Sequence, residues 1–523
     1  MHLSRYCFLI VFFLSTFVFQ CGDKDQVQPK PVVEDEVEEE IPTSKLLQDL
    51  DSSDVFLRSQ ATIQLGSRQV KESVPKLKKL LTDKEPGVRA GAAIALGDLQ
   101  ERSATQTIVK LLESDKENPK DVYLDALGRL KDPSAGKQIV LLLDSEDPTL
   151  RLQTIEALVL IGAKDQGASI LKMALKNKNR EKDKTYAMAL GKLGYKGSED
   201  YLLGLTKTLD ESTTLAAAYL ALGRIGAKKA VPILAKALDL SFSKGKENAS
   251  VSLIQIGDPK TIDLVFPLLE SKTEETQMYV TDVLSGIPSL EAGKRALALL
   301  NSDKKSTWGN AAKIAGRQKY APAREKLESL LVLDSTPSRD SFAEALGWIG
   351  DKASIPVLRK ILLSGAKEGP YGSAWALGVM GAKEAVGDLI TATNSSDGKL
   401  VSYALEALGS IRDESALPAL TRLLKNRPQM APQVLSAVSQ LQSKEARLVI
   451  EDATNSNDPN VYRPAMEELA RRKDKLSLPI LFEHVNGPEA EKRKLSYYAL
   501  AAITGEHFRT KKEWNDWRTK TKN

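Results

Sequence analysis

Hydrophobic and small residues follow one pattern along most of this 523-residue chain. Residues 88–99 read VRAGAAIALGDL, and variants of this stretch return about every 31 residues as far as the C-terminal end. With Leu96 as the reference, the equivalent positions are Leu65, Leu96, Leu127, Leu158, Leu190, Leu222, Leu253, Leu284, Ile314, Leu346, Leu377, Leu408, Val438, Leu469 and Leu500. A fixed period of roughly 20 to 50 residues is typical of a solenoid built from stacked units.

Small residues flank the reference position in most repeats. The residue before it is usually Ala, and the residue after it is Gly at 66, 97, 128, 191, 223, 347, 378 and 409. Gly inside a helix costs roughly 1 kcal/mol relative to Ala, so its return at one position needs a reason in packing. We expect these glycines to let the backbones of stacked helices approach closely.

A second helix follows the first in each repeat. Ten residues after the reference, five repeats carry a proline that follows an aliphatic residue: Pro75, Pro232, Pro356, Pro418 and Pro479. Proline is tolerated in the first turn of a helix, and the apolar spacing after it predicts an amphipathic helix. Each unit is therefore predicted to be a helical hairpin that buries its apolar face only by stacking.

The combined pattern, aliphatic-Pro-x-Leu-x-x-Leu-Leu followed by Val-Arg-x-x-Ala-Ala-x-Ala-Leu-Gly, resembles HEAT repeats of the short subtype first described in phycobilin lyases. The resemblance covers residues 43–505. It implies an all-α solenoid of about fifteen stacked helical hairpins, a HEAT-like superhelix. It also implies that the helix with the Val-Arg pair lines a concave face and carries the binding contacts.

The N-terminal segment has the features of an export signal. Arg5 precedes an apolar run at residues 8–19, which is too short for a comfortable membrane span. We expect residues 1–20 to be a signal peptide, with a short membrane anchor as the alternative. The sequence Val18-Phe19-Gln20-Cys21 resembles a bacterial lipobox, although Gln20 stands where Gly or Ala is usual. The resemblance implies lipidation of Cys21, and ordinary cleavage nearby, leaving a free thiol, is the alternative.

Composition changes sharply after Cys21. Residues 22–42 hold three prolines and eight acidic residues against two lysines, which predicts an extended, self-repelling linker. The predicted organisation is a signal peptide at 1–20, a lipidated cysteine and acidic linker at 21–42, a solenoid at 43–505 and a C-terminal cap or tail at 506–523. Trp514 and Trp517 are expected to fold onto the last helix as that cap, with a membrane-binding basic tail as the alternative.

Charge and candidate chemistry exclude several classes of function. The residues after the linker hold 71 basic and 61 acidic side chains, interspersed and without a nucleic-acid-binding motif, so we expect no nucleic-acid partner. No cysteine remains there, and His484 and His507 lie in different segments. Because no nucleophile motif, phosphate loop or metal-ligand spacing occurs, we expect no enzyme, no metal and no cofactor.

A basic residue often stands seven positions before the reference. It is found at Arg58, Arg89, Lys120, Arg151, Lys246, Arg339 and Arg493. In HEAT repeats an Arg near this position often pairs with an Asp of the preceding turn, and Asp83 lies six residues before Arg89. We favour a structural ladder of Arg–Asp pairs over a binding stripe, since an Arg fork satisfies carboxylates and turn carbonyls well.

Aromatic residues gather in three consecutive repeats. Trp308, Trp348 and Trp375 are the tryptophans inside the repeats, and Tyr371 lies four residues before Trp375. Trp308 and Tyr371 stand six before the reference, where other repeats carry polar residues, so we expect them to be exposed. Exposed aromatic residues on rigid elements are typical of binding hot spots. The partner-binding hypothesis therefore names Trp308, Arg339, Trp348, Tyr371 and Trp375, and filling of gaps between irregular repeats is the alternative.

The sequence as a whole predicts a non-catalytic, membrane-tethered scaffold that binds protein or peptide partners on the concave face of its solenoid. The expected location is the bacterial cell envelope, held by the N-terminal lipid on the outer membrane, its periplasmic face or the cell surface. A surface adhesin for host or matrix ligands is one alternative. A lyase-like or enzyme-assisting protein is another, because phycobilin lyases share the repeat.

Overall fold

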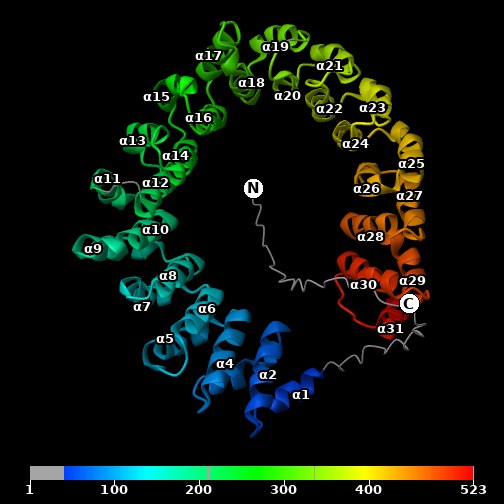
Figure 1. Ribbon diagram of the computed structural model, residues 1–523. Helices are drawn as coiled ribbons and strands as arrows, with labels where there is room; N and C mark the ends of the chain where they lie inside the picture. Colours follow the sequence, from blue (N-terminus) through cyan, green and yellow to red (C-terminus); the bar gives the residue numbers. More distant parts are fainter. Residues whose placement is uncertain (1–40, 209–211, 335, 522–523) are drawn as a thin grey trace, which may run out of the picture. The chain divides into compact units, whose positions relative to one another are not determined.

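The computed structural model describes residues 41–208, 212–334 and 336–521. All regular secondary structure in these residues is helical (Figure 1). The predicted signal peptide at 1–20, Cys21 and nearly all of the predicted linker at 21–42 lie outside the described residues. Within the described part of the chain, no helix is both long enough and apolar enough to cross a membrane.

The helices alternate between two ranks. The odd-numbered rank consists of α1 (Thr43–Asp49), α3 (Val74–Leu80), α5 (Thr105–Ser114), α7 (Gly136–Ile139), α9 (Gly167–Lys176), α11 (Glu199–Thr208), α13 (Val231–Ala237), α15 (Thr261–Val265), α17 (Leu290–Leu300), α19 (Arg324–Leu331), α21 (Ile355–Leu362), α23 (Val386–Ala392), α25 (Leu417–Asn426), α27 (Lys444–Thr454) and α29 (Leu478–Asn486). The even-numbered rank consists of α2 (Val55–Ser67), α4 (Pro86–Asp98), α6 (Lys120–Leu130), α8 (Pro148–Leu160), α10 (Asp183–Leu193), α12 (Thr213–Ile225), α14 (Ser243–Ile256), α16 (Glu274–Gly286), α18 (Trp308–Arg317), α20 (Arg339–Ile349), α22 (Pro370–Val379), α24 (Gly398–Ile411), α26 (Ala431–Gln440), α28 (Pro459–Arg472) and α30 (Ala490–Thr504). A last helix, α31 (Lys511–Thr521), follows them.

The predicted solenoid of helical hairpins is confirmed. Each even-numbered helix packs against the next even-numbered helix and against the odd-numbered helix before it. All fifteen predicted reference residues lie in even-numbered helices, and each is at most 1% exposed. The even-numbered helices lie on the inner side of the curved stack in Figure 1. The apolar residues that recur with this period thus lie where the even-numbered and odd-numbered helices pack together.

The prolines mark helix starts, as predicted. Pro75, Pro232, Pro356, Pro418 and Pro479 each stand in the first turn of an odd-numbered helix. Backbone N–H groups in the first turn of a helix have no acceptor within the helix, so proline, which has no N–H, removes no hydrogen bond there. The proline therefore marks where each of these five odd-numbered helices begins.

The glycine after the reference is where neighbouring backbones meet. A Cβ added to Gly191 on α10 would lie 2.6 Å from the Cα of Ala221 on α12. The same contact joins Gly66 to Ala95 at 2.7 Å and Gly378 to Ala407 at 2.8 Å. Because real Cβ atoms do not approach this closely, the repeating Gly and Ala are required for helix spacing, as the sequence predicts.

One repeat has a different register from the predicted one. A Cβ on Gly316 of α18 would lie 2.7 Å from the Cα of Ala345, which is the contact that the other repeats make with the residue after the reference. The reference residue of α18 is therefore Ala315, and the predicted choice of Ile314 is wrong by one position. Both residues are fully buried, so burial alone does not separate them. With Ala315 the neighbouring steps of 30 and 32 residues both become 31.

Substitution of Gly191 by Ala tests the close helix contact. Gly191→Ala is expected to lower the free energy of unfolding by about 1–3 kcal/mol, because the new methyl group meets backbone atoms that cannot move independently. Gly387→Ala on α23 is the matched control, since nothing lies within 4 Å of a Cβ there. Thermal and urea unfolding followed by circular dichroism would measure both. Equal stability of the two variants would contradict the packing role.

Candidate interaction surface

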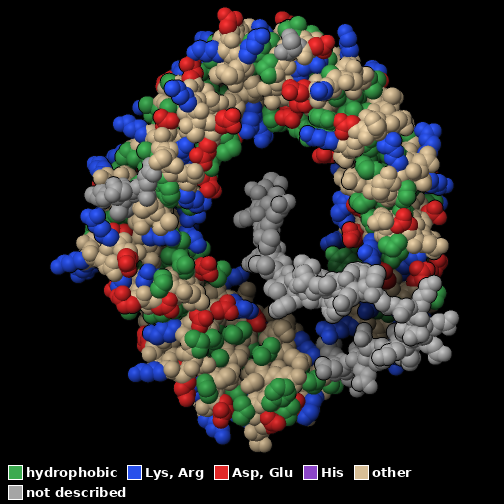
Figure 2. Space-filling view, viewed as in Figure 1, with side chains coloured by type: hydrophobic (Ala, Val, Ile, Leu, Met, Phe, Trp, Pro, Cys, Tyr) green, Lys and Arg blue, Asp and Glu red, His purple; other side chains and the backbone are tan. Residues whose placement is uncertain are grey.

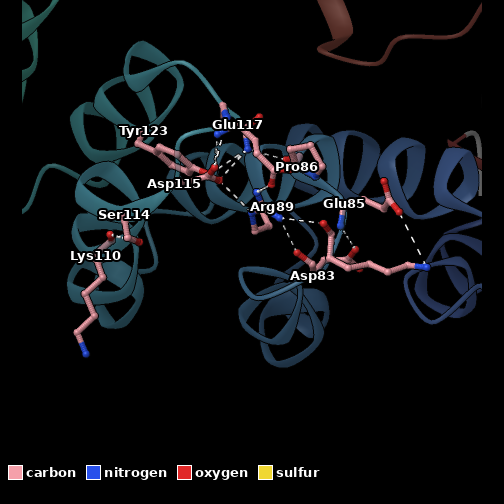
Figure 3. A network of polar contacts seen from close by, with 11 residues as sticks. Asp83, Glu85, Pro86, Arg89, Lys110, Ser114, Asp115, Glu117 and Tyr123 are labelled. Carbon is pink, nitrogen blue, oxygen red and sulfur yellow. Dashed lines mark hydrogen bonds and ion pairs between the residues drawn. The ribbon is translucent and has the colours of Figure 1, made fainter.

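Arg89 connects two consecutive turns of the stack (Figure 3). Its Nη1 donates to the main-chain carbonyls of Asp83 (2.9 Å) and Lys84 (3.1 Å), in the turn before its own helix. Its Nε donates to the carboxylate of Asp115 in the next turn (2.9 Å). The predicted pairing of Arg89 with the Asp83 side chain is wrong, because that carboxylate accepts from Arg58 of the preceding repeat (3.0 Å). A ladder exists at Arg58 and Arg89, but there each ion pair runs from the Arg to the turn of the following repeat.

The main-chain half of this contact recurs through the stack. A side chain seven before the reference donates to the carbonyl six residues earlier in the chain, and we call this contact the turn clamp. Its donor–acceptor pairs are Arg58–Ser52, Arg89–Asp83, Arg151–Ser145, Gln277–Ser271 and Arg493–Gly487, at 2.7–3.0 Å. Lys246 instead donates to Glu275 and Thr276 of the next repeat, and Lys120 is exposed. These bonds support the structural interpretation of the basic positions.

Arg339 does not lie on the outer surface of α20. It is 3% exposed, its Nε donates to the Leu331 carbonyl (2.7 Å), and its Nη1 pairs with Asp334 (3.2 Å). A buried guanidinium that is already bonded to its own turn offers little to a partner. The structure therefore separates Arg339 from the aromatic residues with which the sequence grouped it.

Asp115 is the most strongly stabilised carboxylate of the ladder. The hydrogen bond from Arg89 holds its pKa far below the usual range, and bonds from Tyr123 (2.5 Å) and Asn118 (3.0 Å) lower the pKa further, while burial opposes them. Burial, with the neighbouring Asp115 as a second cause, raises the pKa of Tyr123 to about 12. The carboxylate thus stays ionised in the folded chain and joins two repeats.

Asp115→Asn is expected to destabilise the chain in a pH-dependent way. A depressed folded-state pKa contributes stability above the unfolded pKa, and that stability is lost as the pH falls through the acid range. At pH 7 the variant should lose on the order of 2–4 kcal/mol, because Arg89 loses its buried counter-charge and keeps only the exposed carboxylate of Glu117. Near pH 2 the difference from wild type should shrink. Asp303→Asn, at an exposed aspartate, is the control, and the two melting-temperature profiles against pH decide the outcome.

Trp308 belongs to the turn clamp. With the corrected register it stands seven before the reference, not six, and the prediction that it is exposed is wrong: it is 9% exposed. Its indole Nε1 donates to the Ser302 carbonyl at 3.0 Å, six residues earlier, as the arginines do elsewhere. Trp308 therefore replaces an Arg of the clamp and does not join the other tryptophans on the surface.

Trp348 and Trp375 meet across two repeats. Their rings lie edge to face with centroids 5.4 Å apart, and the Arg317 guanidinium lies 4.7 Å from the Trp348 ring. Both tryptophans are half-buried. Each lies over the glycine of the preceding repeat, since a Cβ on Gly316 or Gly347 would come within 3.0 Å of the Trp348 or Trp375 ring. The missing glycine side chain makes room for the indole.

Tyr371 extends this arrangement to the next helix. Its hydroxyl donates to Asp397 (2.6 Å), its ring lies 5.8 Å from the Tyr403 ring, and the Lys399 ammonium lies 4.4 Å from its ring centroid. We call Trp348, Trp375, Tyr371 and Tyr403 the aromatic row; it crosses α20, α22 and α24 (Figure 1). Sequence reasoning missed Tyr403, although it lies 32 residues after Tyr371, close to one repeat.

Charged groups of both signs border the aromatic row. Burial raises the pKa of Glu344, which precedes Trp348 by one helical turn, and the nearby Asp340 carboxylate raises it further. Asp340 itself accepts hydrogen bonds from the main-chain N–H groups of Gly369 (3.0 Å) and Gly372 (2.8 Å). The row thus places half-buried aromatic rings beside a carboxyl group whose pKa is raised by burial.

The C-terminal tryptophans pack as the sequence predicts. Trp514 is fully buried, its ring lies edge to face against Phe508 at 5.0 Å, and its Nε1 donates to the Phe508 carbonyl (3.1 Å), again six residues earlier. Trp517 stacks on Phe482 of α29 at 6.4 Å. Helix α31 therefore covers the apolar face that the last hairpin would otherwise expose.

The histidines lie apart from the aromatic row. His484 Nε2 lies 2.8 Å from the Thr454 hydroxyl, and burial lowers its pKa. In the part of the chain that the structure describes, no group of three or more His, Cys, Asp or Glu side chains is arranged to hold a metal ion.

Comparison with protein families agrees with the geometry of the stack. The family model for HEAT repeats matches residues 43–122, 168–249 and 367–431, and the model for the PBS lyase HEAT-like repeat matches residues 338–364. The chain therefore contains HEAT repeats. No curated protein sequence matches this HEAT-repeat chain.

Solved structures that match this chain include the following three. The Kap95:Nup1 complex matches with 14% identity over 88% of this chain and 75% of that chain, with a TM-score of 0.50. Importin beta matches with 15% identity over 88% and 72%, with a TM-score of 0.45. The complex of CpcE and CpcF of phycocyanin lyase from Nostoc sp. PCC7120 matches with 24% identity over 47% and 100%, with a TM-score of 0.26. At 14% identity, the match to the Kap95:Nup1 complex shows a shared fold and nothing about function.

Proposed function

We propose that this HEAT-repeat protein is a non-catalytic scaffold that binds a protein or peptide partner across its even-numbered helices. The observation that carries the proposal is the aromatic row, in which Trp348, Trp375, Tyr371 and Tyr403 lie side by side on three consecutive helices. Half-buried aromatic residues held on rigid helices are the commonest anchors of protein interfaces. Extended solenoid surfaces use such anchors for contacts at several points along a partner.

The geometry of the row favours a partner that lies across the helices. Its members come from positions that are two, five or six residues away from the reference, so they project from one side of the even-numbered rank. Arg317 and Lys399 lie over the two outer parts of the row and carry positive charge there. A peptide with apolar side chains and a carboxylate near either end fits this arrangement.

We also propose that the scaffold is tethered to a membrane of the bacterial cell envelope through lipid on Cys21. The support is the apolar segment at 8–19, the lipobox-like Val18-Phe19-Gln20-Cys21 and the acidic residues 22–42 that follow. Two or three acyl chains give stable anchoring, because each buried CH₂ contributes about 0.8 kcal/mol. An extended acidic segment would then hold the repeats away from the lipid surface.

The double substitution Tyr371→Ala/Trp375→Ala tests the binding role. It should reduce recovery of the partner about tenfold or more in a crosslinking pull-down from native membranes, since it removes two hot-spot side chains. It should leave the melting temperature nearly unchanged, because both rings are half-buried on the surface of α22.

Trp308→Ala is the matched control for loss of an aromatic side chain. Trp308 is buried in the turn clamp, so its removal should lower the melting temperature while the folded fraction still binds the partner. An unchanged partner profile in the Tyr371/Trp375 variant would reject the aromatic row as the binding site. A large loss of stability in that variant would instead assign the two residues to the core.

Lipidation is tested by Cys21→Ser in the full chain expressed in bacteria. The wild type should incorporate an alkyne-labelled fatty acid and partition into the detergent phase of Triton X-114, and Cys21→Ser should do neither. Cys7→Ser, within the predicted signal peptide, is the control and should keep both properties. Fatty-acid labelling of the Cys21→Ser variant would show that the attachment site is elsewhere.

A further inference from the structure

A second surface lies on the even-numbered rank, far along the chain from the aromatic row. Helices α4, α6 and α8 line a groove of about 330 Å³ that we call the N-terminal groove. Ile94, Val122 and Leu160 form its apolar part, and Leu160 is 51% exposed. Figure 2 shows acidic side chains beside exposed hydrophobic ones over this region.

Three carboxylates border the apolar part of the groove: those of Asp121, Asp125 and Glu156. Asp125 is paired with Arg129 at 2.9 Å. Asp121 accepts bonds from the main-chain N–H of Val122 (3.0 Å) and from the Gln153 amide (3.3 Å), which are neutral donors. Two of the three charges are therefore not balanced by a cation in these contacts.

Glu156 stands out within this group. Among the residues that the structure describes, it forms no hydrogen bond and no ion pair through its carboxylate, and its side chain is exposed on α8. It lies two residues before the reference, on the same face as Asp125 of α6. The groove thus presents an apolar floor with free negative charge along its side.

The sign of the surface charge reverses at the next two helices. Lys184 and Lys192 on α10 and Arg224 on α12 are all exposed, and none has an ion-pair partner in the described part of the chain. They occupy positions six before or two after the reference, which point to the same face as the groove residues. Because α8 packs against α10, an acidic band and a basic band lie side by side.

We propose that the N-terminal groove binds a segment of the partner protein that carries an aliphatic side chain flanked by Lys or Arg and followed by acidic residues. The aliphatic side chain enters between Ile94 and Leu160, the basic residues pair with Asp121 and Glu156, and the acidic residues reach the cations of α10 and α12. This inference rests on the proposed scaffold function and names the chemistry of its partner. Complementary charge of this kind fixes the direction of a bound segment and excludes polyanions from the acidic band.

The test uses the full-length protein in detergent and two synthetic fluorescein-labelled peptides. The probe has three alternating Lys–Ile pairs, a Gly-Gly spacer and three Glu residues, and its twin has Lys and Glu exchanged. Fluorescence anisotropy at low salt should show the probe binding about tenfold more tightly than the twin, because like charges face each other in the twin complex. Equal affinity for the two peptides would overturn the proposal.

Variants locate the binding. Asp121→Asn/Glu156→Gln should weaken probe binding about tenfold and leave the melting temperature unchanged, since these are rim charges. Glu113→Gln/Glu384→Gln removes the same charge from exposed positions outside the groove and should bind the probe as wild type does. If both double variants weaken binding equally, the attraction is due to net charge and the groove is not a site.

Two further readouts separate this inference from the proposed function. The Tyr371→Ala/Trp375→Ala variant should bind the probe normally. If it loses the native partner but still binds the probe, the loss is due to the aromatic row and not to the groove. Failure of the probe with an intact pull-down rejects only the groove. Sedimentation of the full-length protein tests whether a second copy of the chain occupies the groove. A dimer that is lost in Asp121→Asn/Glu156→Gln would assign the groove to that second copy and overturn the proposal.

Discussion

The contact between glycine on one even-numbered helix and alanine on the next is the constraint on which the stack depends. At Gly191 and Ala221 the two backbones are so close that even one methyl group does not fit between them. This contact fixes the spacing and rotation of successive helices, and the reference leucines fill the space that remains behind it. A fixed rotation also brings equivalent surface positions of different repeats into one line. Trp348 and Trp375 can touch only because the helices that carry them are held at this spacing.

Much of the fold was predictable because it depends on a local pattern repeated many times. Proline in the first turn, glycine after the reference and the apolar period each carry the same information in several repeats. The errors arose where one repeat had to be interpreted alone. Ile314 and Ala315 both fit a buried helix position, and only the packing of Gly316 on Ala345 distinguishes them. That shift of one residue turned Trp308 from a buried clamp residue into an expected surface residue.

The site was harder to predict because its contacts connect different repeats. Sequence spacing cannot tell whether a turn carboxylate pairs with the Arg before it or after it, so it does not show that Asp83 pairs with Arg58 and not with Arg89. No local sequence pattern distinguishes Tyr403, and it belongs to the row only because its ring packs against that of Tyr371. The N-terminal groove was likewise invisible, since Ile94 and Glu156 belong to different helices. Separate surfaces on one rank of helices would let a single partner be held at two points, which raises the effective concentration at the second site.

The turn clamp has a consequence for the evolution of the repeat. A donor that must reach the carbonyl six residues earlier permits no insertion or deletion in the turn that it closes. The turn before α20 is longer. There Arg339 donates to the Leu331 carbonyl, eight residues earlier, in place of the carbonyl six residues earlier. Insertions and deletions among related chains should therefore occur mainly in turns that lack the turn clamp or close it with a donor at a different spacing. The six-residue turns would then keep their length even where their sequences have diverged beyond recognition.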